Sequence, residues 1–124
     1  MKMRQRLQKD KKVKAFKITS KAVWGFERVF KQYIHREESG GLWAYVRHLS
    51  QREQHRARQV QSSETVQFVF AYSPKITLNL YLEFEGKTYK IVAIDYFESN
   101  KTDLEIKAEE VSVPAFDEVE FEEY

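Results

Sequence analysis

Alternating apolar and polar positions predict that most of this chain is extended. The clearest alternation spans residues 42–47, where aromatic and β-branched residues recur with the period of two that is typical of a β-strand. Similar patterns predict strands over five further ranges: 13–19, 65–72, 76–82, 88–96 and 104–109. Residues 21–35 fit both helical spacing and a bent strand, and we interpret them as extended.

Residues that favour turns separate these predicted strands. Gly40 and Gly41 end a loop before the strand at 42, and Pro74 ends the strand at 65–72 because proline cannot continue a central ladder. Residues 84–87 predict a tight hairpin in which Gly86 supplies a positive φ. Short strands joined by tight turns, with one inserted helix, predict a mainly-β fold, a small antiparallel β-barrel.

The inserted helix is predicted over about residues 51–60. Ser50 and Glu53 fit the S-x-x-E capping box, in which each side chain satisfies a free backbone N–H at the helix start. This helix has almost no apolar face, and it carries four basic or titratable side chains: Arg52, His55, Arg56 and Arg58. It is therefore either a solvated connector or a surface that meets another molecule.

The distribution of charge divides the chain. The net charge of +2 combines +11 over residues 1–62 with −9 over residues 63–124. Residues 1–12 form a basic N-terminal arm that could attract phosphate without sequence preference, or could simply keep the terminus soluble. We therefore expect three parts: the arm at 1–12, the barrel at 13–110 and an acidic aromatic tail at 111–124.

The tail combines acids with spaced aromatic residues. Residues 109–124 hold seven acids and no base, and among them lie Phe116, Phe121 and Tyr124. This composition suits docking onto a groove or a basic surface of a partner. Folding back onto the basic N-terminal half of the same chain, or disorder, is the alternative.

No pattern for catalysis, cofactor binding or metal binding is present in the sequence. The chain has no cysteine, which excludes disulfides and thiolate metal sites, and His35, His48 and His55 are too sparse for a metal centre. Nucleophile-elbow, P-loop and dinucleotide-binding motifs are absent. The paired acids at 37–38 and 109–110 lie in loop or tail contexts that would not separate their pKa values for acid–base work. We expect neither an enzyme nor a cofactor, and a soluble protein without a membrane segment or export signal.

Nucleic-acid binding is the alternative that the residues themselves leave open. A small barrel with a basic arm could stack bases on Trp24, Phe26, Trp43 and Tyr45, in the manner of an OB-fold. Core packing also explains these aromatics, and the acidic second half would repel phosphate.

The order of motifs over roughly residues 42–110 resembles tailed-phage head–tail joining proteins. The matching residues are Leu42 to Val46, Leu49-Ser50-x-x-Glu53, Ala57, Thr65 to Tyr72, Pro74, Ile76, Leu82, Gly86-Lys87, Tyr89-Lys90-Ile91 and Leu104-Glu105-Ile106. The sequence departs from the family pattern at Ala71, Leu82 and Phe84, and residues 1–41 match poorly.

This resemblance implies a head-closure, or stopper, protein of the head–tail connector. Such proteins assemble as a homo-oligomeric ring between the portal or adaptor above and the tail proteins below. The connection at residues 48–64 would face the channel and help retain packaged double-stranded DNA without sequence specificity. Arg52, His55, Arg56 and Arg58 would then face the DNA or a neighbouring subunit. The acidic aromatic tail lies outside the resemblance and is particular to this chain, and we predict from its composition that Phe116, Phe121 and Tyr124 dock onto a partner. The protein would be made in the host cytoplasm and reside in the virion neck, with another neck or tail-completion protein as the alternative.

Overall fold

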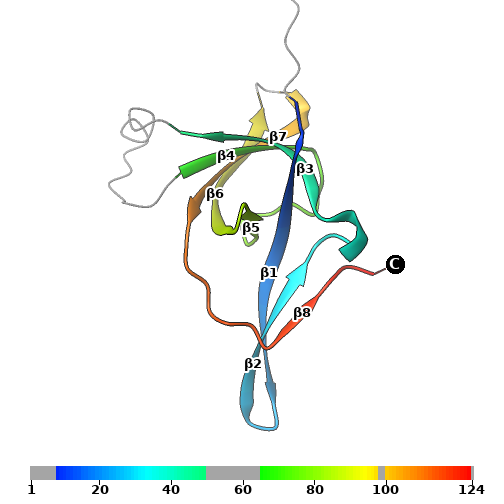
Figure 1. The fold of residues 1–124 in the computed structure, drawn as a ribbon, viewed down its shortest axis with the longest axis vertical. Helices are drawn as coiled ribbons and strands as arrows, with labels where there is room; N and C mark the ends of the chain where they lie inside the picture. Colours follow the sequence, from blue (N-terminus) through cyan, green and yellow to red (C-terminus); the bar gives the residue numbers. More distant parts are fainter. Residues whose placement is uncertain (1–7, 50–64, 98–99, 124) are drawn as a thin grey trace, which may run out of the picture.

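The computed structural model describes residues 8–49, 65–97 and 100–123, which form one mixed sheet of eight strands and a short 3₁₀ turn (Figure 1). The elements are β1 (Lys11–Val23), β2 (Phe26–Tyr33), η1 (Glu37–Ser39), β3 (Leu42–His48), β4 (Thr65–Ala71), β5 (Tyr81–Phe84), β6 (Lys87–Phe97), β7 (Asn100–Glu110) and β8 (Glu118–Glu120). The strand order is β3-β4-β7-β6-β5-β1-β2-β8, and β2 and β8 are the parallel pair among the described strands. The predicted mainly-β class is confirmed.

Strand β1 pairs with three neighbours along its length. Lys11–Val13 pair with β3, Lys14–Phe16 pair with β5, and Phe16–Val23 pair with β2. The pairing with β3 links the first strand of the sheet order back to β1, so six strands form a closed circuit of hydrogen-bonded neighbours. The second half of β1 leaves this circuit with β2 and forms a long hairpin, at one end of the longest axis of the molecule in Figure 1.

Gly41 allows the approach of β3 to β1. Its φ is +126°, and a Cβ atom built there would lie 2.6 Å from the backbone oxygen of Val13. Any other residue would clash with the backbone that β1 contributes to this pairing. The predicted glycine loop before residue 42 is therefore a steric requirement of the circuit.

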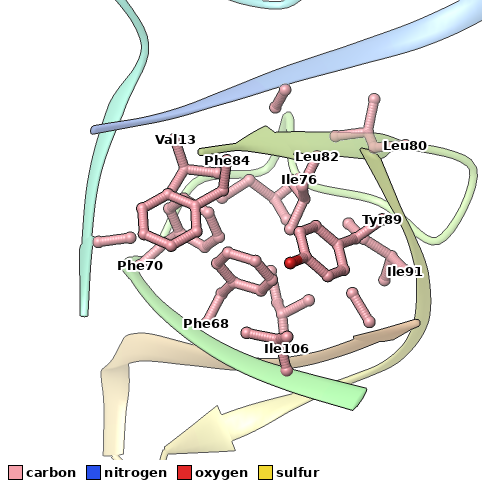
Figure 2. Packing of buried hydrophobic residues seen from close by; sticks show 14 of the residues in the cluster. Val13, Phe68, Phe70, Ile76, Leu80, Leu82, Phe84, Tyr89, Ile91 and Ile106 are labelled. Carbon is pink, nitrogen blue, oxygen red and sulfur yellow. The ribbon is translucent and has the colours of Figure 1, made fainter. Parts of the chain in front are cut away.

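The core fills the space inside the six-strand circuit. Phe68 and Phe70 of β4, Tyr89 of β6 and Ile106 of β7 have exposed fractions of 1% or less (Figure 2). The Phe68 ring meets Tyr89 edge-on at a centroid distance of 5.6 Å. Burying each side chain of this size stabilises the fold by roughly 1.5–3 kcal/mol. The apolar side chains of the alternating pattern are therefore the main source of the stability of the fold.

Two tight turns close hairpins with the same backbone pattern. Glu85 and Gly86 have φ of 51° and 77° between β5 and β6, and Trp24 and Gly25 have φ of 53° and 79° between β1 and β2. Positive φ at both central residues is characteristic of the type I′ turn, whose twist matches that of the strands. The hairpin predicted at residues 84–87 and the extended interpretation of residues 21–35 are both confirmed.

The strand predicted over residues 76–82 is wrong for its first five residues, since β5 begins at Tyr81. Instead, two turns follow Pro74: Ile76 N–H donates to the Ser73 carbonyl at 3.2 Å, and Leu80 N–H donates to the Thr77 carbonyl at 3.2 Å. Ile76 and Leu80 are buried while Leu78 is 56% exposed. These consecutive turns place Ile76 and Leu80, the first and fifth residues of the segment, on the core. The alternating apolar pattern of this segment therefore arises without a strand.

The structure describes both ends of the predicted barrel, but it does not describe the predicted helix. Lys11 and Lys12, assigned to the basic arm by the sequence, belong to β1 and pair with Ala44 and Trp43. The tail segment contributes β8. The helix predicted at about 51–60, with its capping box, lies outside the described residues, and the described ranges contain no α-helix.

Candidate docking surfaces

The acidic tail lies along the outer edge of β2. Residues 118–120 pair in parallel with residues 30–32. Asp117 joins both sides of this contact: its backbone N–H donates to the Val29 carbonyl at 2.8 Å, and its carboxylate accepts from the Val29 N–H at 2.8 Å. Further along, the Glu122 N–H donates to the His35 carbonyl at 3.1 Å. The tail therefore completes an edge that β2 would otherwise expose.

Two of the predicted docking aromatics contact rings of this chain itself. Phe116 meets Phe16 edge-on at a centroid distance of 5.9 Å, and Phe121 stacks on Tyr33 at 4.7 Å with an interplanar angle of 16°. Both Phe116 and Phe121 are half-buried. Tyr124 lies outside the described residues. The arrangement is the self-docking alternative that the sequence left open, and docking of these three residues onto a partner stays a prediction.

Opposite charges reinforce the docked tail. Glu118 pairs with Arg28 at 3.4 Å, Glu122 pairs with Lys75, and the Gln32 amide donates to Glu120 at 2.9 Å. The Arg28 and Gln32 contacts join the acidic end of the chain to its basic half, and the Lys75 contact joins it to the turns at residues 73–80. Exposed ion pairs each contribute only about 0–1 kcal/mol. A hollow of about 470 Å³ remains between the tail and the turns that follow Pro74.

A titratable cluster lies beneath the tail. The Tyr33 hydroxyl donates to Glu83 at 2.6 Å; burial first, then this hydrogen bond and the Glu83 charge, hold the pKa of Tyr33 well above its ordinary value. Lys31 pairs with the same carboxylate. The neighbouring His35 is 4% exposed, and burial is the main cause that lowers its pKa. Its Nδ1 lies 3.3 Å from the Arg36 carbonyl, and its Nε2 has no hydrogen-bond partner among the residues that the structure describes.

The tip of the β1–β2 hairpin is a second exposed surface, and it is more apolar than the tail. Trp24 is 93% exposed and Phe26 is 74% exposed. The sequence treats these residues as part of a stacking surface with Trp43 and Tyr45. In the structure, Trp43 lies on β3 opposite Lys12, near the start of β1, whereas Trp24 follows the end of β1. Nearly the whole length of β1 separates the two tryptophans, so the proposed four-ring stacking surface is not formed.

Positions that the sequence offered for DNA contact or metal binding have the following placement. Arg52, His55, Arg56 and Arg58 lie outside the described residues. Over the described ranges, no group of three His, Cys, Asp or Glu residues is arranged to hold a metal ion. Helical structure in those same ranges is neither long nor apolar enough to cross a membrane.

The family of the chain follows from a comparison of its whole sequence with known families. Residues 2–111 match the model of the phage head completion protein family, which is most of the chain. The chain belongs to the phage head completion protein family. This membership makes it a structural, non-enzymatic component of the virion in the head–tail region, with partners among the other virion proteins. The resemblance stated from the sequence is therefore confirmed.

Solved structures share the fold of this head completion protein at low sequence identity. A Shigella flexneri 2a protein determined in solution superimposes with a TM-score of 0.61 at 16% identity, over 84% of this chain and 94% of that one. A chain from the virion of a native gene transfer agent particle superimposes with a TM-score of 0.53 at 17% identity, over 87% of this chain and 98% of that one. Among curated proteins, none matches the sequence.

Proposed function

We propose that this head completion protein is a head-closure protein that forms a ring between the portal or adaptor and the tail. The match to the head completion family over residues 2–111 is the observation that carries the proposal. The likeness to a chain of a gene transfer agent virion is consistent with it. We interpret the six-strand circuit as the small barrel from which such a ring is built, made in the host cytoplasm before assembly.

Exposed apolar side chains on the outside of the circuit favour assembly with other copies. Strand β6 has an apolar middle, and a register shift between Ile91 and Ala93 leaves Val92 44% exposed, close along the strand to Tyr96 at 41%. We interpret these two side chains as part of the surface that a neighbouring copy covers. Four consecutive apolar residues in the middle of β6, Ile91 to Ile94, suit a strand that is covered on both sides, in a barrel wall or under a neighbouring subunit.

We propose that the connection between β3 and β4 faces the central channel and helps to retain DNA. The sheet fixes both ends of this connection, because His48 pairs with Val66. Arg52, His55, Arg56 and Arg58 lie within it, and cations there would bind the phosphate backbone without reading sequence. A neighbour's acidic surface is the other target for the same side chains.

Replacing Arg52, Arg56 and Arg58 together by alanine tests this role. The variant should still enter particles, since the six-strand circuit is intact, but the particles should lose packaged DNA. The measurements are the amount of this protein per purified particle and the fraction of particles that contain DNA. Particles with normal protein content and normal DNA retention would exclude the channel role of these arginines. The proposed head-closure function would not be affected by that result.

The tail is the third part of the proposal. For a partner to take up Phe116, Phe121 and Tyr124, the tail must leave β2, which costs the contacts with Phe16 and Tyr33 described above. We propose that tail proteins or the adaptor bind it in this released form, with its acids directed at a basic surface.

A further inference from the structure

The hairpin tip is an apolar anchor held away from the rest of the molecule. Pairing of β1 with β5 ends at Phe16, and pairing of β2 with β8 begins only at Phe30. Residues 20–27 are exposed throughout. The two-residue turn holds Trp24 in a positive-φ conformation that residues other than glycine, asparagine and aspartate rarely adopt. The hairpin therefore presents its two aromatic rings in a defined position, and nothing in the described part of the chain covers them.

A hollow that is lined in part by apolar side chains lies beside Asp95 and Tyr96, near the end of β6. It has a volume of about 440 Å³, its floor includes the buried side chains of Ile76 and Leu104, and its rim includes Tyr72 at 52% and Tyr96 at 41% exposure. Ligand pockets in proteins have volumes of roughly 300–1,000 Å³, so the hollow is large enough to receive aromatic side chains. The end of β6, beside this hollow, and the β1–β2 turn lie at opposite ends of the longest axis in Figure 1, so a chain cannot fill its own hollow.

Charges around the two surfaces are complementary. Lys21 and Arg28 are paired across the hairpin, two residues farther from the tip than the Val23–Phe26 pair. Both pairs lie on the same face of the hairpin. Asp95 lines the hollow and stands opposite Glu105 on β7. Like charges directly opposite on neighbouring strands are unfavourable. The basic pair is relieved in part by the 3.4 Å contact of Arg28 with Glu118, whereas the acidic pair has no ion-pair partner among the described residues.

We propose that the hairpin tip of one copy inserts into this hollow of the next copy in the ring. Trp24 and Phe26 fill the space between Tyr72 and Tyr96, and the Lys21–Arg28 pair lies against the Asp95–Glu105 pair. The contact is heterologous, since the two surfaces differ, and a heterologous contact closes into a ring when its rotation permits. The proposal rests on the proposed ring and names its interface. Tip-to-tip contact is disfavoured because it would bring two basic pairs together.

Cross-linking between marked copies tests the interface directly. The chain has no cysteine, so F26C and Y72C each introduce a single reactive thiol. The two variants, carrying tags of different length, are produced together during particle assembly, and purified particles are treated with a short bis-maleimide. We expect a product that joins F26C to Y72C, and about tenfold less product between two copies of the same variant.

The outcomes separate the interface from the proposed function. If the chain is absent from purified particles, the proposed head-closure function is wrong. The same mixture of variants is then cross-linked at high concentration in solution, and the absence of a mixed product there overturns the proposed interface. If the chain is present in particles and no mixed product forms, the interface is wrong while head closure stands. A product of F26C with itself in an amount equal to or greater than the mixed product, or a product of F26C with another virion protein, also overturns the proposal.

Tip variants give a second test with a built-in check on folding. The double variant W24N/F26T creates an Asn-Gly turn, which favours the observed type I′ geometry, and removes both rings. Its incorporation into particles should fall at least about tenfold with the melting temperature of the monomer unchanged. W43T, at the other exposed tryptophan, is the matched control and should incorporate normally. Equal incorporation of W24N/F26T and W43T would overturn the proposal.

Charge reversal examines the complementary pairs. K21E and D95K should each reduce incorporation, and the combination should restore it because the same two charges again meet with opposite sign. Additive loss in the double variant would show that the two positions do not face each other.

Discussion

The six-strand circuit and the hairpin–tail unit that projects from it are stabilised by different kinds of contact. Inside the circuit, Phe68, Tyr89 and Ile106 are essentially inaccessible to solvent, and every strand has paired neighbours on both sides. In the projecting unit, two strands are completed by three residues of β8, and the most exposed aromatic rings of the described chain lie at its tip. The comparison separates residues that specify the fold from residues available to other molecules.

The largest expected effect lies in the circuit. Phe68→Ala should lower the free energy of unfolding by about 3–5 kcal/mol, because it leaves a cavity among Phe70, Phe84 and Tyr89 that the closed circuit cannot fill. Urea denaturation followed by fluorescence or circular dichroism measures this change.

Trp24→Asn, at the hairpin tip, is the matched variant outside the circuit. It removes a larger ring, yet it should change the same free energy by no more than about 0.5 kcal/mol, since the indole has no packing to lose. Similar losses for the two variants would mean that the hairpin is part of the folding core, and the distinction between the two regions would be incorrect.

A smaller effect is expected where the tail meets β2. Phe121→Ala should cost about 1–2 kcal/mol, because the ring is half-buried and stacks on Tyr33. Amide hydrogen exchange should show faster exchange for the Glu122 N–H, which donates to the His35 carbonyl.

Val119→Ala provides the control for that variant, since Val119 lies in β8, two residues before Phe121, but is 52% exposed. It should leave both the stability and the exchange rate close to those of the unaltered chain. Equal effects of the two substitutions would indicate that β8 is held by its backbone pairing alone, and that the Tyr33–Phe121 stack contributes little.

The same comparison explains which parts of the fold follow from sequence. Alternation identified the strands at 42–48, 65–71 and 100–110 because each places apolar side chains on the core from a regular strand. It failed at residues 76–80, where turns bury Ile76 and Leu80 through a different backbone path. The closure of β1 onto β3 depends on a contact distant in sequence, and a local pattern carries no information on such a pairing.

The candidate docking surfaces were only partly predictable for a related reason. The composition of the tail indicated that it docks onto a surface. The sequence does not distinguish docking onto Tyr33 of the same chain from docking into a groove of a partner. Trp24 and Phe26 were visible as aromatics of a strand segment. Their role as an exposed tip depends on where the pairing with β5 and β8 ends, and this follows only from the register.

The smallest expected effect concerns pH and the cluster beneath the tail. Burial, with a further contribution from the nearby Lys14 and Lys12 charges, lowers the pKa of His35, while the Arg36 carbonyl and Glu83 oppose this shift. The folded protein therefore favours the neutral ring. The stability due to this preference is fully present above the pKa of about 6.5 that histidine has in the unfolded chain, and it is lost as the pH falls below that value toward the lowered pKa of the folded state.

Melting temperatures measured between about pH 7.5 and pH 5 test this expectation. The unaltered chain should lose more stability over that range than His35→Gln, because glutamine cannot take up a proton in the site between Tyr33 and Phe121. The two proteins differ only at residue 35, so the difference between the two curves reports the effect of His35. Parallel curves for the unaltered chain and His35→Gln would mean that protonation of the buried ring does not destabilise the fold. They would also mean that the docking of the tail is not sensitive to the charge of His35.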